Sequence, residues 1–307
     1  MTIPAAAAVL ALGLAACGGD SGDNGDETPA GDATGATTDG GDTGASGKLA
    51  ELQEAGTITV GFAGEAPYSF MDENGELAGA SVALQERIWG ELGIENVEGV
   101  QAEFGQLIQG LNAGHFDAVA AGMSILPERC EQALFSDPEF QYTTALMVEE
   151  GNPHDLHGMQ DIADADDVQM AAMTGAIEAT YAADLGIDAT EVGNPQDGMD
   201  LVTGGRADVF ALTGISLNWM VDNAPDAGIE VTESFVAEIN GVMQYGAGGT
   251  VFRPEDTDMR DAYNEQLAPI VEDEAEYLSV VGDWGFTAEE RPTGDFTTEQ
   301  LCSGEIG

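Results

Sequence analysis

The stretch that decides the fold class is residues 104–121, FGQLIQGLNAGHFDAVAA. Leu107, Ile108 and Leu111 recur at helical spacing over residues 104–113 and would face a core. Residues 117–121 form a short apolar run that is typical of a buried strand. A helix followed at once by a buried strand is part of a βαβ unit, so the sequence predicts an α/β fold with a largely parallel sheet.

The same alternation extends to both sides of this stretch. Upstream, we predict strands at 57–62 and 97–102, with a helix between them that carries Leu84, Ile88 and Leu92 and ends at Gly93. Downstream, the alternation restarts after about residue 150. The elements predicted there are strands at 168–172 and 207–212, helices at 175–185, 195–203 and 215–221, an extended run at 241–252, and helices at 254–267 and 272–281.

Two such units predict two lobes. In open α/β sheets ligands lie beyond the carboxyl ends of the strands, so we expect the ligand cleft between the lobes. Lobe 1 is assigned to residues 48–146 plus 244–307 and lobe 2 to residues 147–243. The chain is expected to cross between them near residues 144–150 and 240–247.

The charge of the chain is extreme. The 307 residues include 7 Lys+Arg and 57 Asp+Glu, a formal net charge of −50. Such a surface repels phosphates and anionic head groups, which argues against nucleic acid and anionic lipid as partners. It indicates adaptation to high salt, where like charges are screened; a generally acidic proteome is the alternative.

The N-terminus resembles a targeting segment. Residues 3–16 are an apolar run too short for a comfortable membrane span, and Leu14-Ala-Ala-Cys17-Gly resembles the bacterial lipobox. We predict a lipoprotein signal peptide at 1–17 with a lipid anchor on Cys17, and a flexible acidic tether at 18–47. An ordinary apolar N-terminus with a chance cysteine is the alternative. Cys130 and Cys302 would then form either a disulfide or two buried thiols.

Several strings together resemble the family 3 solute-binding proteins, the polar amino acid class of ABC importers. They are Gly56–Gly61, Ala66–Phe70, Asp72–Gly75, Gly79–Ser81, Leu107–Gly114 with Asp117, Ala121–Arg129 and Phe135–Pro138. The resemblance implies a two-lobed periplasmic-binding-protein type II fold, a monomer outside the cytoplasm, and delivery of a small solute to an ABC permease. It implies no enzyme, cofactor or metal.

A narrower resemblance points to the ectoine/hydroxyectoine-binding branch. It rests on Gly64–Tyr68, Glu103–Gly105, Pro127–Cys130, Thr174–Glu178 and Phe210–Thr213. The implied ligand is a zwitterion with a carboxylate and a delocalised amidinium cation. The candidate ligand residues are Glu65, Tyr68, Phe104, Gly122, Ser124, Arg129, Thr174, Gly175 and Thr213.

The resemblance implies a role for each of these candidates. Arg129 would pair with the carboxylate, helped by backbone at Gly122, by the Ser124 hydroxyl and by N–H groups of Thr174 and Gly175. The faces of Tyr68 and Phe104 would hold the cation, and Glu65 would accept hydrogen bonds from the N–H groups of the cation. The alternatives are a surface ion pair for Arg129, an N-cap for Thr174, core packing for the aromatics and a solvated loop charge for Glu65.

Two departures from the family pattern leave the ligand open. The ectoine branch often has a third aromatic where this chain has Ser124, so the aromatic box is either open on one side here or filled by Phe140 or Tyr142. Amino acid binders carry an aspartate that pairs with the α-ammonium where this chain has Thr213, which disfavours α-amino acids unless Glu65 or Asp208 compensates. A polar amino acid therefore remains the alternative ligand.

Other classes of protein fit less well. Some proteins of this architecture resemble cyclohexadienyl dehydratases, and a sensor or scaffold module is a further alternative. His154 and His157 are three residues apart, but they lie in a connection with Gly and Pro, so we predict no metal site.

The acidic composition makes a testable prediction about salt. Dialysis from about 1 M to about 0.01 M salt lengthens the Debye length from about 3 Å to about 30 Å, so repulsion among the carboxylates is no longer screened. We expect loss of helical circular dichroism on dialysis and its return when salt is restored. An unchanged spectrum at low salt would contradict adaptation to high salt.

Overall fold

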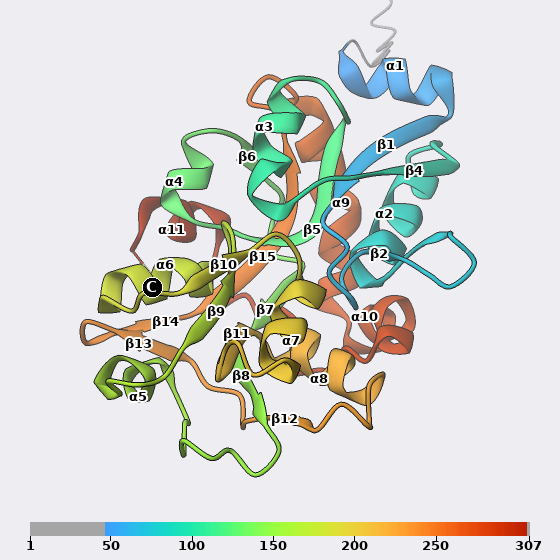
Figure 1. Ribbon diagram of the computed structural model, residues 1–307. Coiled ribbons are helices and arrows are strands. Elements are labelled where there is room, and N and C mark those ends of the chain that lie inside the picture. Colours follow the sequence, from blue (N-terminus) through green and yellow to red (C-terminus); the bar gives the residue numbers. More distant parts are fainter. Residues whose placement is uncertain (1–46, 306–307) are drawn as a thin grey trace, which may run out of the picture. The chain divides into compact units, whose positions relative to one another are not determined.

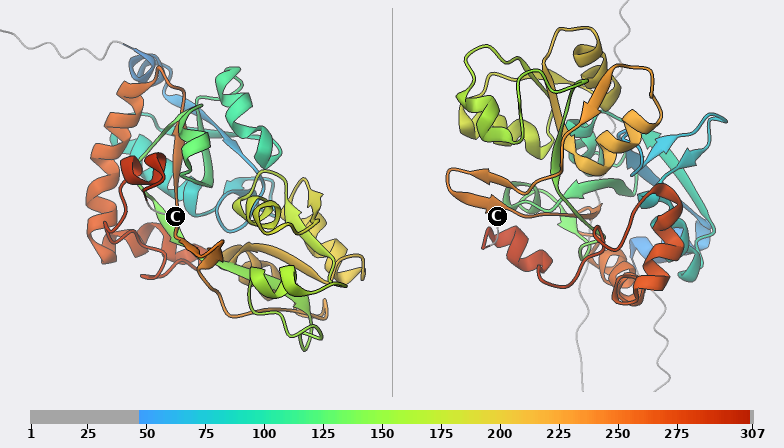
Figure 2. Two further views of the ribbon diagram at one scale, coloured as in Figure 1. Left: turned by 90° about the vertical axis from the view of Figure 1, so that its left-hand side faces the viewer. Right: turned by 90° about the horizontal axis from the view of Figure 1, so that it is seen from below.

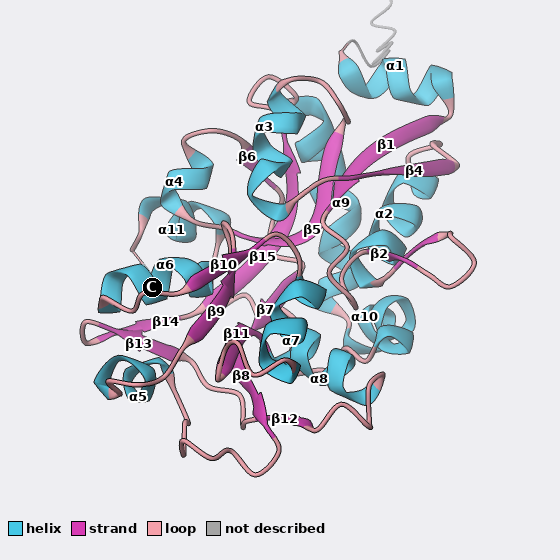
Figure 3. Ribbon diagram, viewed as in Figure 1, coloured by secondary structure: helices cyan, strands magenta, loops and turns pink. Residues whose placement is uncertain are grey.

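The apolar strand segments of the sequence assemble into two main sheets, one for each lobe of the molecule (Figure 1). The computed structural model describes residues 47–305. The predicted signal peptide, Cys17 and all of the tether up to residue 46 lie outside the described residues. Figure 3 shows that helices and strands alternate through most of the described chain.

The first sheet has the strand order β4-β1-β5-β15-β6, and β7 also pairs with β15. Its strands are β1 (Thr57–Phe62), β4 (Asn96–Gln101), β5 (Ala118–Ser124), β6 (Leu134–Phe135), β7 (Phe140–Tyr142) and β15 (Gly246–Phe252). β1 runs parallel to β4 and β5, whereas β15 runs antiparallel to β5, β6 and β7. A late strand thus completes a sheet that early strands begin.

Helices cover this sheet and bury its apolar side chains. They are α1 (Lys48–Ala55), α2 (Ala80–Glu91), the short η1 (Phe104–Gln106) with α3 (Leu107–Asn112), α9 (Thr257–Glu272), α10 (Glu274–Val281) and η2 (Gly282–Trp284). Trp89 of α2 is fully buried, with its ring centroid 6.3 Å from Phe252 and 5.3 Å from Tyr263. A two-stranded ribbon, β2 (Phe70–Met71) with β3 (Leu77–Ala78), precedes α2.

A polar network lies inside this core. Oε1 of Glu139 accepts hydrogen bonds from Thr250 Oγ1 at 2.6 Å and from the Tyr263 hydroxyl at 2.7 Å. Gln85 donates to both of these hydroxyl groups and accepts from Trp89 Nε1. Burial raises the pKa of Glu139 to about 7 despite these donors, because a charged carboxylate is poorly solvated there.

The second sheet has the strand order β10-β9-β11-β8-β12. Its strands are β8 (Thr144–Glu149), β9 (Met170–Met173), β10 (Thr190–Val192), β11 (Val209–Thr213) and β12 (Ile229–Val231). The helices of this lobe are α5 (Met159–Asp164), α6 (Ile177–Leu185), α7 (Pro195–Thr203) and α8 (Gly214–Asp222). Gly198 of α7 packs against the buried Phe210 ring, where an added Cβ would come within 2.6 Å of ring atoms.

The chain passes between the two sheets twice. β7 ends at Tyr142 in the first sheet and β8 begins at Thr144 in the second, ahead of the 144–150 stretch expected from sequence. The return runs through the hairpin of β13 (Ala237–Ile239) and β14 (Val242–Gln244) and enters β15 at Gly246. Figure 2 shows the green and yellow segments of the second lobe beside the blue and red segments of the first.

Sequence analysis located most elements correctly, and residues 195–203 form α7 at the predicted bounds. Three expectations were wrong. The sheets are not largely parallel, because β15, β8 and β12 enter antiparallel. The predicted run 241–252 is two strands separated at Tyr245, because its first part closes a hairpin. Pro254 does not begin a helix, because Asp256 N donates to Arg253 O in a turn and α9 starts at Thr257.

The C-terminal segment is fixed to lobe 1. Cys130 in the short helix α4 (Pro127–Cys130) and Cys302 in α11 (Thr298–Ser303) form a disulfide with Cα atoms 5.6 Å apart. Thr297 caps α11 with a capping box that uses Gln300. Among the described residues, no helix has the length and apolarity that crossing a membrane requires.

We expect the disulfide to stabilise the folded state strongly, because it joins residues 172 apart in sequence and restricts the unfolded chain. We expect reduction, or Cys302→Ser, to lower the free energy of unfolding by about 2–5 kcal/mol, measured by chemical denaturation. The double variant Cys130→Ser/Cys302→Ser is the control and should not respond to reductant. Equal stability of oxidised and reduced wild type would contradict the prediction.

Candidate functional site

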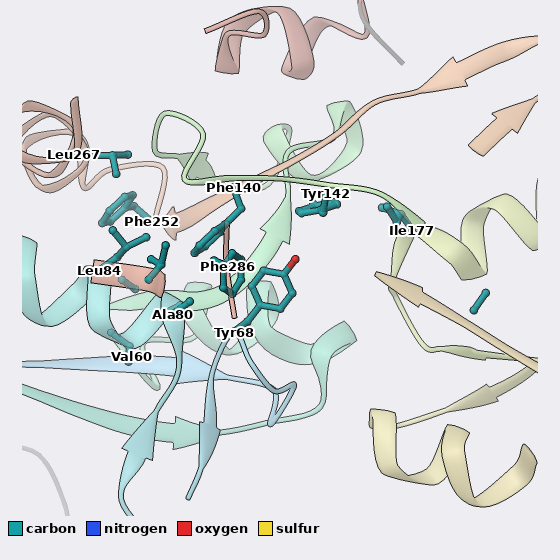
Figure 4. Packing of buried hydrophobic residues seen from close by; sticks show 14 of the residues in the cluster. Val60, Tyr68, Ala80, Leu84, Phe140, Tyr142, Ile177, Phe252, Leu267 and Phe286 are labelled. Carbon is teal, nitrogen blue, oxygen red and sulfur yellow. The ribbon is translucent and has the colours of Figure 1, made fainter. Parts of the chain in front are cut away.

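Residues from both lobes line a small cavity of about 20 Å³. Its walls come from the loop after β1, from η1, β5 and β7 on one side, and from β9, α6 and β11 on the other. The lining residues are Glu65, Tyr68, Phe104, Gly122, Ser124, Tyr142, Met173, Ala176, Ile177, Glu178, Leu212 and Thr213. Figure 4 shows Tyr68, Tyr142 and Ile177 of this group where the lobes meet.

The structure brings most of the predicted ligand residues to this cavity. Six of the nine line it: Glu65, Tyr68, Phe104, Gly122, Ser124 and Thr213. The other three, Arg129, Thr174 and Gly175, lie immediately beside it, because each contacts a lining residue or its neighbour. Residues far apart in sequence therefore meet in one place, which the fold achieves by joining the two lobes there.

The position of Tyr68 depends on Gly122. The Tyr68 ring is buried and meets the rings of Phe140 and Phe286 edge-on, each at 5.4 Å between centroids (Figure 4). Gly122 interrupts β5 with a φ of +55°, and a Cβ there would lie 2.4 Å from Cδ1 of Tyr68. Only glycine accommodates both the left-handed backbone and the close approach of the ring.

Tyr142 provides the third aromatic side chain of the cavity. It lines the wall beside Ser124, and its ring centroid lies 6.4 Å from that of Tyr68. Phe140, the other residue considered for this place, packs behind Tyr68 in the core. The hydroxyl groups of Tyr68 and Tyr142 are buried and make no hydrogen bond with a described residue. Burial also raises the pKa of both phenols, so both stay neutral and offer an O–H donor.

Glu65 reaches from lobe 1 to lobe 2. Its Oε1 accepts a hydrogen bond from the Ser216 hydroxyl at 2.7 Å and a longer one from Thr213 at 3.5 Å. Burial, and to a lesser extent the negative charge of Glu178, raises the pKa of this carboxyl to about 7 although both hydroxyl donors lower it. Ser216 was not predicted, although it follows Thr213 by three residues at the start of α8, where such a hydroxyl can turn toward Thr213.

Glu178 is a second polar residue of the site that the sequence analysis did not predict. It lies in the first turn of α6, is 1% exposed and lines the cavity. Oε1 accepts a hydrogen bond from Thr144 Oγ1 at 3.3 Å, and burial raises its pKa to about 7. It belongs to the string Thr174–Glu178 that carried the family resemblance. The sequence did contain a signal for this residue. Glu178 is a charged residue next to apolar Ile177 in an otherwise apolar helix start, and a charged residue in such a place is unusual.

Arg129 bridges the two lobes at the edge of the cavity. Its guanidinium donates to Ser124 O at 2.8 Å and to Gly175 O at 2.7 Å, and it lies over the Phe104 ring at 5.6 Å. Burial lowers its pKa, although a guanidinium remains charged at any physiological pH. An arginine has five N–H donors, so three are left after these two bonds.

The turn at Thr174 and Gly175 matches the expected anion site only in part. The Thr174 N–H donates to Val192 O, so it is engaged in a backbone bond, whereas the Gly175 N–H donates to no backbone carbonyl of the described residues. Gly175 has a φ of +79°, and a Cβ there would lie 2.9 Å from Cα of Gly105. This turn is therefore a close contact between the lobes, and Gly175 contributes its carbonyl to Arg129.

The cavity thus combines aromatic faces, two buried carboxyl groups and one guanidinium. Such a set recognises a small molecule that carries both charges, because the guanidinium suits a carboxylate and the carboxylates and ring faces suit a cation. His154 and His157 lie elsewhere and contact different aspartates, at 3.4 Å and 3.0 Å. Asp208 contacts His154 and Gln169 N, so it does not compensate for Thr213 at the cavity.

Comparison with known sequences finds one family. Residues 58–284 match the bacterial extracellular solute-binding proteins, family 3. A probable amino-acid ABC transporter periplasmic-binding protein of Sinorhizobium fredii is 33% identical over 262 residues, which is 83% of this chain and 86% of that protein. A putative ABC transporter arginine-binding protein of Escherichia coli is 25% identical over 237 residues, covering 74% and 90%.

The fold is also similar to those of solved structures. The crystal structure of EhuB in complex with hydroxyectoine is similar with a TM-score of 0.75 and 32% identity, covering 83% of this chain and 97% of that one. An ancestral amino acid-binding protein, described as a precursor of cyclohexadienyl dehydratase, has a TM-score of 0.68 and 25% identity, covering 78% and 99%. Both likenesses extend over the two lobes.

The contact of Gly122 with Tyr68 predicts a local effect of a single methyl group. We expect Gly122→Ala to lower the free energy of unfolding by about 1–3 kcal/mol, because it strains the backbone and displaces the ring. Gly90→Ala is the matched control: this exposed helical glycine has open space around its Cβ position, and alanine should stabilise by about 0.5–1 kcal/mol. Equal denaturation midpoints for Gly122→Ala and wild type would contradict the role of Gly122.

Proposed function

This chain belongs to family 3 of the bacterial extracellular solute-binding proteins, and on that premise we propose that it captures an ectoine-type zwitterion for an ABC importer. The observation that carries the proposal is the cavity itself, where aromatic faces and buried carboxyl groups adjoin a single guanidinium. The similar EhuB structure was solved with hydroxyectoine, a compound of this class, which supports the choice of ligand.

Each half of such a ligand has candidate partners in the walls of the cavity. The free N–H donors of Arg129 suit the carboxylate, with the Ser124 and Tyr142 hydroxyl groups nearby. The ring faces of Tyr68 and Phe104 suit a delocalised cation, which attracts an aromatic face within about 6 Å. Glu65 accepts hydrogen bonds from the N–H groups of that cation. Thr174 lies beside the cavity, and because its N–H donates to Val192 O it supplies no N–H group to the ligand in this proposal.

Capture proceeds by closure of the two lobes around the solute. The contacts that join the lobes here include Glu65 with Ser216, Arg129 with Gly175 O, and the Phe70 ring with the Trp219 ring at 5.9 Å. Each would break when the lobes part, so bound solute and these contacts favour the same closed state. The permease would recognise that state.

A polar amino acid is the second candidate ligand. Several relatives are named as amino-acid or arginine-binding proteins. Glu178 gives this candidate a specific support, because a second buried carboxylate at the cavity can pair with an α-ammonium in place of the aspartate that Thr213 replaces. A dehydratase activity has weaker support: the similar ancestral structure related to that enzyme is itself described as a binding protein.

The proposal also concerns where in the cell the protein acts. Relatives named as periplasmic-binding proteins place the family outside the cytoplasm. For this chain we propose a lipid anchor at Cys17, the tether 18–47 between the anchor and the folded lobes, a monomeric state and function at high salt. The permease and ATPase would be separate chains.

The proposal predicts calorimetric binding of ectoine to the purified protein at high salt. We expect Arg129→Ala to weaken that binding by about 100-fold or more, because a buried carboxylate would lose its charged partner. Arg87→Ala is the control and should bind as wild type, since Arg87 is an exposed residue that pairs with Glu91 and Glu276. Wild-type affinity in Arg129→Ala would refute the site. Binding of amino acids without ectoine would favour the second candidate.

A further inference from the structure

The ionised side chains at the cavity carry one negative charge more than positive charges, and a zwitterion does not neutralise it. Two carboxyl groups line it, Glu65 and Glu178, which are 4% and 1% exposed. Arg129 is the cationic residue that touches its wall, through Ser124 O and the Phe104 ring. With all three ionised the site carries a net charge of −1. A zwitterion adds one charge of each sign and leaves that excess unchanged.

An uncompensated charge is costly in such a place. The cavity is small and both carboxyl groups are shielded from solvent, so water cannot replace a missing partner. In the complex, Arg129 pairs with the ligand carboxylate and one glutamate pairs with the ligand cation. The second glutamate then has only uncharged donors, such as Thr144 Oγ1 and a backbone N–H for Glu178 or Ser216 Oγ for Glu65. A proton taken up from solvent removes this excess.

Resting on the function proposed above, we propose that Glu65 and Glu178 together hold one proton when a zwitterion is bound, and none when the solute carries one more positive charge. The reaction is the uptake of one proton from solvent by the carboxylate pair on binding, and it involves no other bond. The proton belongs to the pair, because two interacting carboxyl groups titrate as a unit. The pair thus adapts one site to both solute classes.

The remaining groups around the pair do not supply this proton. Burial raises the pKa of both glutamates to about 7, so above that pH the pair is largely ionised in the free protein and has room for a proton. The other titratable groups that face the pair are Arg129, Tyr68, Tyr142 and Tyr181. Burial raises the pKa of the three phenols, and the guanidinium stays charged, so none changes its protonation near neutral pH.

The sign of the pH dependence follows from proton uptake. When binding takes up one proton, affinity falls as pH rises, by about tenfold per pH unit once the free pair is ionised. The affinity for a solute of net charge +1 does not fall in this way, because both carboxylates keep a positive partner. The two classes therefore respond differently to the same change in pH.

The experiment counts protons by calorimetry at about pH 8.5 in two buffers with different ionisation enthalpies. The probes are ectoine, as the zwitterion, and arginine, as the cationic solute, each with a blank titration. We expect uptake of about one proton per ectoine in the wild type, and about none for arginine if it binds. Glu178→Gln should bind ectoine with almost no uptake, because one carboxylate then suffices for one cation.

Glu139→Gln is the matched control. Glu139 is buried and has a pKa of about 7, but it lies in the core of lobe 1 and does not line the cavity, so its removal should leave the proton count at one. Ectoine binding without proton uptake in the wild type would overturn the inference and leave the proposed function intact. Uptake that persists in Glu178→Gln would also overturn it. Failure of ectoine and every amino acid to bind would refute the proposed function, and this inference with it.

Discussion

The guanidinium of Arg129 is the contact on which the site depends. It donates to Ser124 O at the end of β5 in one lobe and to Gly175 O beside α6 in the other. A single side chain is thereby bonded to the backbone of both lobes while its face rests over Phe104. Because the planar fork fixes the direction of each N–H, the remaining donors have a defined direction too. A lysine would give neither the two-sided bridge nor that orientation.

The aromatic side chains set the shape of the cavity around this bridge. Tyr68 is held by Gly122 on one side and by Phe140 and Phe286 on the other, so its ring has little freedom. Tyr142 adds a second phenol at the wall beside Ser124. The hydroxyl groups of both tyrosines are buried and have no hydrogen-bond partner within residues 47–305, so they give this wall polar atoms as well as ring faces. The cavity is therefore matched to small solutes that are polar and partly flat.

Charge is distributed very unevenly between the surface and the interior. The chain carries a formal net charge of −50, yet its interior site keeps one of the few arginines. A strongly acidic surface repels the carboxylate end of a zwitterion and attracts its cationic end, so the buried guanidinium must supply the attraction for the carboxylate. Salt screens the surface far more than the buried groups. The site can therefore work unchanged where the surface charge is almost fully screened.

The sequence by itself determined the fold class, most of the element positions and six of the twelve residues that line the cavity. Apolar periodicity reports which segments pack, and ordered motifs such as Ala121–Arg129 report residues that share one site. The tertiary structure decided the rest: the antiparallel entry of β15, the engagement of the Thr174 N–H by Val192, and the place of Glu178 and Tyr142 in the cavity. Strand direction and side-chain proximity depend on contacts between segments far apart in the chain, such as Glu65 with Ser216, and local sequence patterns carry no record of those contacts.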